Sequence, residues 1–151
     1  MTPLNLPAYE VRLAQRNGKT MIYDFLRKRY ITLTPEEWVR QHFTHFLVEQ
    51  KGYPTALLGN EVGLNVGGVN RRCDTVLYHR EGGRPRVIVE YKAPEIQITQ
   101  KVFTQISSYN SVFRADYLMV SNGISHYCCR MDYENRSVVF LKDIPSYEEL
   151  K

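Results

Sequence analysis

The chain has 151 residues, of which 43% are hydrophobic and 24% are charged, and its formal net charge is +4 at pH 7. This size and balance predict one globular domain over residues 1–151 and exclude a disordered or low-complexity protein. No apolar stretch is long enough to span a bilayer and the first residues do not resemble a signal peptide, so we expect no membrane association. The positive charge suits a polyanionic partner without establishing one.

The N-terminal part is expected to form a β-hairpin. Residues 9–16 and 19–25 flank Asn17-Gly18, a strong signal for a two-residue hairpin turn. We treat residues 1–30 as an extension of a core that covers residues 34–142. The basic segment Arg27-Lys28-Arg29 is either a solvated turn or a phosphate contact, and we favour the turn.

A helix is predicted from Thr34 to Gly52. Thr34 is a favourable N-cap, Pro35 suits the first helical position, and Glu37 completes a capping box by reaching back to the Thr34 amide. Apolar residues then recur at helical spacing, as on a helix that packs against a core. They are Val39, Phe43, Phe46 and Leu47.

The two glutamates at the start of this helix are expected to differ in direction. On a helical wheel, Glu36 lies on the apolar face and Glu37 points outward. Glu36 is therefore the one that we expect to face the sheet. The alternative is that Glu36 only stabilises the helix N-terminus.

The rest of the chain alternates strands with one more helix. Strands are predicted at 57–66, 72–79, 86–93, 117–120, 125–131 and 137–142, with a helix at 99–113. The polar tail after residue 142 is expected to fray. This order predicts an α/β protein whose mixed β-sheet is flanked by two main helices.

The three cysteines, Cys73, Cys128 and Cys129, form no even framework and no Cys-x-x-Cys pair. Adjacent cysteines are poorly placed to bridge each other, so reduced thiols in a cytoplasmic protein are the expected state. Although His126 lies near them, Cys128 and Cys129 would face opposite ways along a strand, which disfavours a zinc site.

Asp74, Glu90 and Lys92 form the informative constellation. Glu90 and Lys92 share a face of their strand, and a hairpin centred on Gly82-Gly83 brings Asp74 beside them. If the paired residue numbers have an even sum, Asp74 joins the same face. Two carboxylates of this kind suit Mg²⁺, with Mn²⁺ as a substitute, and a nearby lysine suits phosphodiester hydrolysis. The alternative is a structural ion pair between Asp74 and Lys92.

This arrangement resembles the PD-(D/E)xK nuclease superfamily. Three segments are similar, more narrowly, to the N-terminal domain of type I restriction enzyme R subunits, and the resemblance runs from residue 22 to residue 131. They are Thr34-Pro35-Glu36-Glu37-Trp38-Val39-Arg40-Gln41, Val89-Glu90-Tyr91-Lys92-Ala93-Pro94 and Ser121-Asn122-Gly123.

The resemblance implies a restriction-endonuclease-like fold and Mg²⁺-dependent endonuclease cleavage of DNA. It implies that Asp74 and Glu90 bind the metal together with the backbone carbonyl of Tyr91, and that Lys92 is catalytic. Cys73 stands where the superfamily motif has proline.

The resemblance also extends to supporting residues and partners. Gln105 and Tyr109 fit the Gln-x-x-x-Tyr that such nucleases carry on the next helix, with a core aromatic as the alternative for Tyr109. Glu36 is the candidate for a further metal ligand from the first helix. The implied partners are DNA and either a second copy or other restriction subunits. Because the chain has no Gly-x-x-x-x-Gly-Lys-Ser/Thr segment, we expect no motor in it.

Two other classes of function stay open. The first is a non-catalytic nucleic-acid-binding or assembly module on the same fold, and intact Asp74, Glu90 and Lys92 argue against it. The second is a small-ligand or protein-interaction domain, which would lack salt-dependent affinity for DNA.

Overall fold

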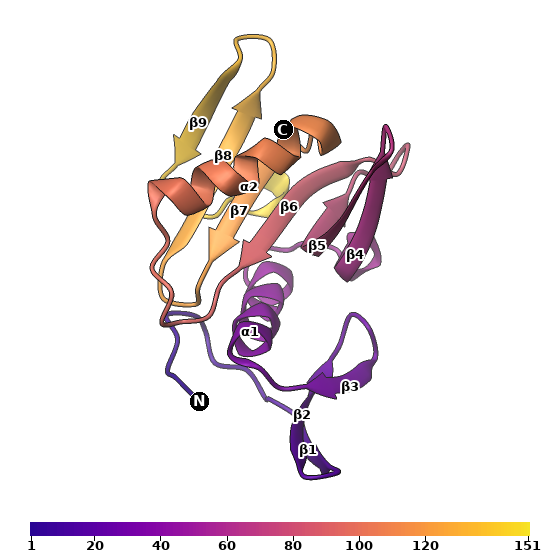
Figure 1. Cartoon of the computed structure of the whole chain (residues 1–151), viewed down its shortest axis with the longest axis vertical. Helices are drawn as coiled ribbons and strands as arrows, with labels where there is room; N and C mark the ends of the chain where they lie inside the picture. Colours follow the sequence, from indigo (N-terminus) through magenta and orange to yellow (C-terminus); the bar gives the residue numbers. More distant parts are fainter.

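The structure is a computed structural model that describes the backbone of residues 1–151 and the side chains of residues 1–108 and 113–151. Two α-helices and two β-sheets make up the fold (Figure 1). In chain order the elements are β1 (Leu13–Arg16), β2 (Lys19–Asp24), β3 (Arg29–Thr32), α1 (Pro35–Glu49), β4 (Leu58–Val66), β5 (Val69–Tyr78), β6 (Pro85–Tyr91), α2 (Gln100–Phe113), β7 (Tyr117–Ser121), β8 (His126–Asp132) and β9 (Ser137–Leu141), with short 3-10 helices at Thr55–Leu57 and Tyr147–Glu149. The predicted α/β class and both helices are confirmed.

The N-terminal sheet has three strands instead of the predicted two. The hairpin at Asn17-Gly18 is confirmed, because both residues have a positive φ and Arg16 pairs with Lys19. After β2 the chain turns, and Asp24 stabilises the turn by accepting the backbone N–H of Leu26 at 2.8 Å. β3 then pairs antiparallel with β2, so the segment that the sequence analysis read as a turn continues into a strand.

The second sheet is mixed, as predicted, and has the strand order β4-β5-β6-β7-β8-β9. Only the β6–β7 pair is parallel, and α2 makes the crossover that a parallel connection needs. In Figure 1, α2 lies across one face of β7 and β8, and α1 lies at the end of the sheet where β6 stops.

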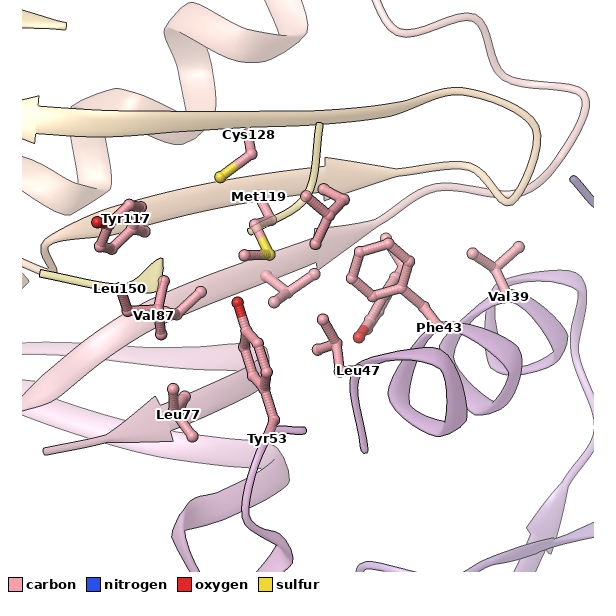
Figure 2. Close-up of a cluster of buried hydrophobic side chains, with 13 residues drawn as sticks. Val39, Phe43, Leu47, Tyr53, Leu77, Val87, Tyr117, Met119, Cys128 and Leu150 are labelled. Carbon is pink, nitrogen blue, oxygen red and sulfur yellow. The ribbon is translucent and has the colours of Figure 1, made fainter. Parts of the chain in front are cut away.

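Alternating side chains divide the core between the two faces of the mixed sheet. The α1 face holds Val39, Phe43 and Leu47 of the helix against strand residues such as Val87 and Met119 (Figure 2). The α2 face holds a second cluster of buried side chains, formed by Cys73, Val76, Ile88, Phe103, Ile106, Phe113, Ala115, Leu118, Val120 and Cys129.

All three cysteines are free thiols and buried, as the sequence analysis expected. Cys128 belongs to the α1-face cluster and Cys129 to the α2-face cluster, so their side chains point in opposite directions. Burial is the main reason that the pKa of each thiol lies above its usual value, which makes the thiolate form unfavourable.

Residues 2–5 dock on the turn between β7 and β8. The backbone N–H of Asn5 donates to the carbonyl of Gly123 at 2.8 Å, and the indole N–H of Trp38 donates to the carbonyl of Thr2 at 3.0 Å. Gly123 has φ +85, and a Cβ there would lie 2.6 Å from the Leu4 side chain. The turn therefore requires glycine for its backbone conformation, and any other residue there would also displace the end of the Leu4 side chain.

The prediction that the tail frays is wrong. Ile144 and Leu150 are buried in the α1-face cluster, at 7% and 6% exposed, and the labelled Leu150 side chain lies beside Val87 in Figure 2. The Leu150 carbonyl also accepts a hydrogen bond from Arg86 at 3.0 Å. Two isolated apolar residues in a polar segment give too weak a pattern to predict this docking.

Within the part of the chain that the structure describes, neither helix has the length and apolar character needed to cross a membrane.

The docked tail yields a stability prediction. We expect Leu150→Ala to lower the free energy of unfolding by about 2 kcal/mol, because it removes buried methyl groups and leaves a cavity against Val87. Urea denaturation measures this change. Glu148→Ala is the matched control, because Glu148 is exposed on the same segment and its replacement should change the free energy by less than about 0.5 kcal/mol. Equal effects of the two substitutions would contradict a docked tail.

Candidate active site

Asp74 and Glu90 meet where the β5–β6 ladder ends. The two strands pair antiparallel, and the last pair toward this end is Thr75 opposite Val89. The paired residue numbers have an even sum, so the predicted register is confirmed and Asp74 lies opposite Glu90.

The Asp74 carboxylate accepts a hydrogen bond from a backbone N–H of β6 that lies beyond the last pair of the β5–β6 ladder. Its Oδ2 accepts the backbone N–H of Tyr91 at 2.8 Å, and its Oδ1 lies 3.5 Å from Nη2 of Arg40. The N–H of Lys92 points to the opposite side of the strand and donates to the carbonyl of Ser121 at 2.9 Å. Because N–H and C=O of one residue share a side in a ladder, the Tyr91 carbonyl points toward Asp74 as well.

Glu90 is the more buried of the two carboxyl groups. Its Oε1 lies 3.1 Å from Nη2 of Arg71, and its side chain is only 12% exposed. It also lies close enough to Asp74 for the charge of Asp74 to act on it. Burial, and then the charge of Asp74, raise the pKa of Glu90 to about 8 against the opposing effect of Arg71. At neutral pH this pair therefore favours keeping a proton.

Lys92 follows β6 directly and is half-buried. Among the described side chains, the ion pair of Asp74 is formed with Arg40 and that of Glu90 with Arg71, and no carboxylate lies within 4 Å of the Lys92 ammonium. The alternative, a structural ion pair between Asp74 and Lys92, is therefore not formed among the described side chains. Lys92 stays two residues from Glu90 without taking part in the neutralisation of either carboxylate.

Arg40 is a member of the site that the sequence analysis missed. The guanidinium is buried, with Nη1 3.0 Å from Glu37 and Nη2 2.7 Å from Glu61 in addition to the contact with Asp74. Burial alone would lower the pKa of Arg40, but the surrounding carboxylates outweigh it and raise the pKa. Glu61 itself has φ +53, an uncommon conformation for a residue other than glycine, in the strand β4.

The helical-wheel prediction for the two glutamates is wrong. Glu36 is exposed and Glu37 is 7% exposed. Thr34 does accept the backbone N–H of Glu37 at 3.0 Å, but the Glu37 carboxylate binds Arg40 and Gln41 instead of the Thr34 amide. The reason is that α1 is buried on two sides, and its second buried side is polar.

The structure does not bring Glu36 to Asp74 or Glu90 in any contact of the described residues. The signal for the correct glutamate lies in the spacing of Glu37, Arg40 and Gln41, which places three hydrogen-bonding side chains on one side of the helix.

The proposed supporting residues lie on α2. Gln105 is exposed, and the side chain of Tyr109 lies outside the described residues. Their predicted contribution to the site therefore stays a prediction.

The donor atoms around Asp74 fit a hard divalent cation. Asp74, Glu90 and the Tyr91 carbonyl supply oxygen atoms only, and Mg²⁺ commonly takes one or two carboxylates and keeps several waters. The charge of Asp74 contributes, after burial, to the raised pKa of Glu90, and a bound cation would relieve this repulsion between the two carboxylates. Among the described residues, no three His, Cys, Asp or Glu side chains form a cluster that could hold a metal ion by themselves. A cation here would therefore need the carbonyl and water.

A mixed sheet between two helices, with an aspartate and a glutamate meeting where two antiparallel strands separate, defines a restriction-endonuclease-like α/β protein. Residues 35–145 match the family described as type I restriction enzyme R protein N terminus (HSDR_N), which is well over half of the chain. The chain belongs to this family of R-protein N-terminal domains.

A solved structure agrees with this fold. The fragment assigned to an HsdR subunit of a type I restriction enzyme from Vibrio vulnificus YJ016 has a TM-score of 0.56 and 20% sequence identity. The alignment covers 78% of this chain and 24% of that chain, and at this identity the likeness concerns the fold alone. No curated protein matches the chain.

The elevated pKa of Glu90 predicts a pH-dependent stability in the metal-free protein. A carboxyl group whose pKa rises from 4.5 to about 8 on folding stabilises the fold below pH 4.5, and this contribution is lost as the pH rises toward 8. We expect Glu90→Gln, which resembles the protonated acid, to gain stability relative to the wild type as the pH increases from about 5 to about 9. Urea denaturation in EDTA across this range measures the difference. Parallel pH profiles for the two proteins would contradict the raised pKa.

Proposed function

We propose that this chain is the nuclease domain of a type I restriction R subunit and that it hydrolyses phosphodiester bonds of DNA with Mg²⁺. The observation that carries the proposal is the register that sets Asp74 opposite Glu90 at the end of the β5–β6 ladder, two residues before Lys92. The family membership supports the same function, because the matched family is the N terminus of a restriction enzyme subunit.

The two carboxylates and the Tyr91 carbonyl would hold the metal ion. When bound, Mg²⁺ stabilises charge on the phosphoryl oxygens and lowers the pKa of a coordinated water. Asp74 would also position another ligand. It accepts the hydrogen bond of the Tyr91 N–H, and this keeps the Tyr91 carbonyl on the same side of β6. Glu90 would bind the cation as a carboxylate and release its proton to solvent.

Lys92 would orient or deprotonate the attacking water. A lysine does this best when its ammonium is not already paired with a carboxylate, because an ion pair stabilises the charged form. In the structure Arg40 lies against Asp74 and Arg71 against Glu90, so these carboxyl groups have cationic partners other than Lys92. The carboxylates pair with arginines and not with Lys92, and this supports the assignment of Lys92 as the residue that acts on the attacking water.

The proposal extends to the setting of the domain. We take residues 1–151 as one nuclease-like domain without the motor of an R subunit, acting in the cytoplasm on DNA. Its partners would be the other subunits of a restriction system or a second copy, because cutting both strands of a duplex favours two active sites. A non-catalytic assembly module is the alternative, and the following two measurements distinguish it from an enzyme.

Lys92→Ala is expected to remove most cleavage while DNA affinity and melting temperature stay close to those of the wild type. A group that acts on the nucleophile contributes chiefly in the transition state, and loss of a general base typically lowers the rate by about 100-fold or more. Cleavage of a labelled duplex with Mg²⁺ measures the effect. Lys142→Ala is the matched control, because Lys142 is exposed just after β9 and this variant should cleave as the wild type does. Unchanged cleavage by Lys92→Ala would remove Lys92 from the mechanism.

Divalent cations are expected to stabilise the wild-type protein against heat. At a hundredfold excess over Kd, a ligand that binds only the folded state adds about 2.7 kcal/mol, which corresponds to a rise of roughly 5–10 °C for a chain of this size. Thermal melts with Mn²⁺ or Mg²⁺ against EDTA measure the rise.

Asp74→Asn should lose most of that rise, whereas Asp143→Asn, at an exposed position, should keep it. The two substitutions remove one negative charge each, so they separate a specific site from a general charge effect. A wild-type melting temperature that ignores millimolar Mn²⁺ would contradict the metal site.

A further inference from the structure

The positive charge of the chain is concentrated at its N-terminal sheet. Residues 12–34 contain six lysines and arginines and one acidic residue, Asp24, for a net charge of +5. The rest of the chain contains 14 lysines and arginines and 15 acidic residues, for a net charge of −1. The basic character of the protein therefore comes from this segment alone, which precedes the family match that begins at residue 35.

The strand register gathers three of these cations on one face. Arg16 pairs with Lys19 across the β1–β2 hairpin, and the backbone of Arg12 pairs with Tyr23 through a 2.9 Å hydrogen bond. Cross-strand partners share a face, and so do alternate residues along β2, so Arg12, Arg16, Lys19 and Tyr23 lie together. All three cations are exposed. We call this side the outer face of the N-terminal sheet.

Two tyrosines on the outer face hold the arginines in place. Tyr23 pairs with Tyr30 across β2 and β3, and their rings are in edge contact at 5.2 Å. The guanidinium of Arg12 lies 4.2 Å from the centre of the Tyr23 ring, and that of Arg16 lies 5.6 Å from the Tyr30 ring. A guanidinium stacked on an aromatic ring keeps its N–H donors directed away from the protein, where they can bind an external anion.

The opposite side of the same sheet is fixed to the candidate active site. Asp24 is fully buried there and accepts a hydrogen bond from Asn60 of β4 at 3.1 Å. Arg27 lies 3.1 Å from Glu37, which also binds Arg40. The only acidic residue of the segment is thus turned inward, and the outer face keeps its cations without a carboxylate among its own strands.

We propose that the outer face of the N-terminal sheet binds the phosphodiester backbone of duplex DNA, the substrate of the Asp74–Glu90 site. This inference rests on the proposed nuclease function. Phosphate is the expected ligand because the face offers two ring-stacked arginines and a lysine, and because the rest of the chain has no excess of positive charge to attract a polyanion. The contacts are to the backbone, so the affinity that they supply does not depend on base sequence.

The salt dependence of DNA binding tests the proposal. The experiment uses a labelled duplex in EDTA, so that cleavage does not interfere, and compares the wild type with the triple variant Arg12→Gln, Arg16→Gln, Lys19→Gln. Each lost phosphate contact reduces the slope of log K against log salt by about 0.9. For three contacts, the loss of affinity between about 50 and about 200 mM salt should be roughly 40-fold smaller in the variant than in the wild type.

Two control variants separate this surface from a general charge effect. Arg136→Gln, Lys142→Gln, Lys151→Gln removes the same charge at exposed positions elsewhere and should retain the wild-type slope. Arg12→Lys with Arg16→Lys keeps the charge and should also retain the slope. Circular dichroism and melting should show that the triple variant folds normally, because all three replaced side chains are exposed.

The proposal is overturned if the triple variant binds with the wild-type slope, or if the two triple variants lose the same amount. It is also overturned if the triple variant loses affinity for polyglutamate while its affinity for DNA is unchanged, since that result would indicate an acidic protein as the partner. Failure of the nuclease proposal would thus appear as absent cleavage with binding intact, and failure of the surface proposal as intact binding by the triple variant.

Discussion

The buried guanidinium of Arg40 touches carboxylates from three elements, Glu37 of α1, Glu61 of β4 and Asp74 of β5. A charge removed from water is costly unless it is paired, and removing one partner of a buried pair leaves the other uncompensated. Each of these groups therefore needs the others to remain where they are. The ion pairs of Arg40 therefore fix the helix α1, the edge strand β4 and Asp74 relative to one another. The N-terminal sheet is connected to the same group of charges, because Arg27 contacts Glu37.

The end of β6 is held from the other side by a chain of hydrogen bonds that ends at the Asp24 carboxylate. The Tyr91 ring is buried in the α1-face core, and its hydroxyl donates to Thr75 at 2.9 Å. Thr75 donates to Asn60 at 2.7 Å, and Asn60 donates to Asp24. One residue thus contributes its side chain to the core and its backbone N–H and carbonyl to the candidate site. The site is rigid because its backbone donor belongs to a residue that the core already immobilises.

The sequence predicted those features that depend on local patterns. Turn residues and alternation were sufficient for the β5–β6 register, which aligned Asp74 with Glu90. The helical wheel failed for Glu37 because it assumes that the buried side of a helix is the apolar one, whereas α1 also buries a polar side. The pairs of Arg40 with Glu61 and of Arg71 with Glu90 join residues about 20 positions apart, and no periodicity in a single sequence encodes such a pairing. No contact of the described residues tests the roles of Gln105 and Tyr109, which stay predictions.

The docking of residues 2–5 on the β7–β8 turn sets an order of events during synthesis. Asn5 bonds to Ile124, 119 positions further along the chain, and Leu4 fits against the one residue without a side chain in that turn. The ribosome releases residues 2–5 long before this turn exists, so these residues have no docking site until β7 and β8 have been made. Because contacts between distant residues form late and slowly, the hydrogen bond from Lys92 to Ser121 that holds the end of β6 would form only after residue 121 has emerged. A nascent chain would thus carry its acidic pair before it has the finished structure that places it.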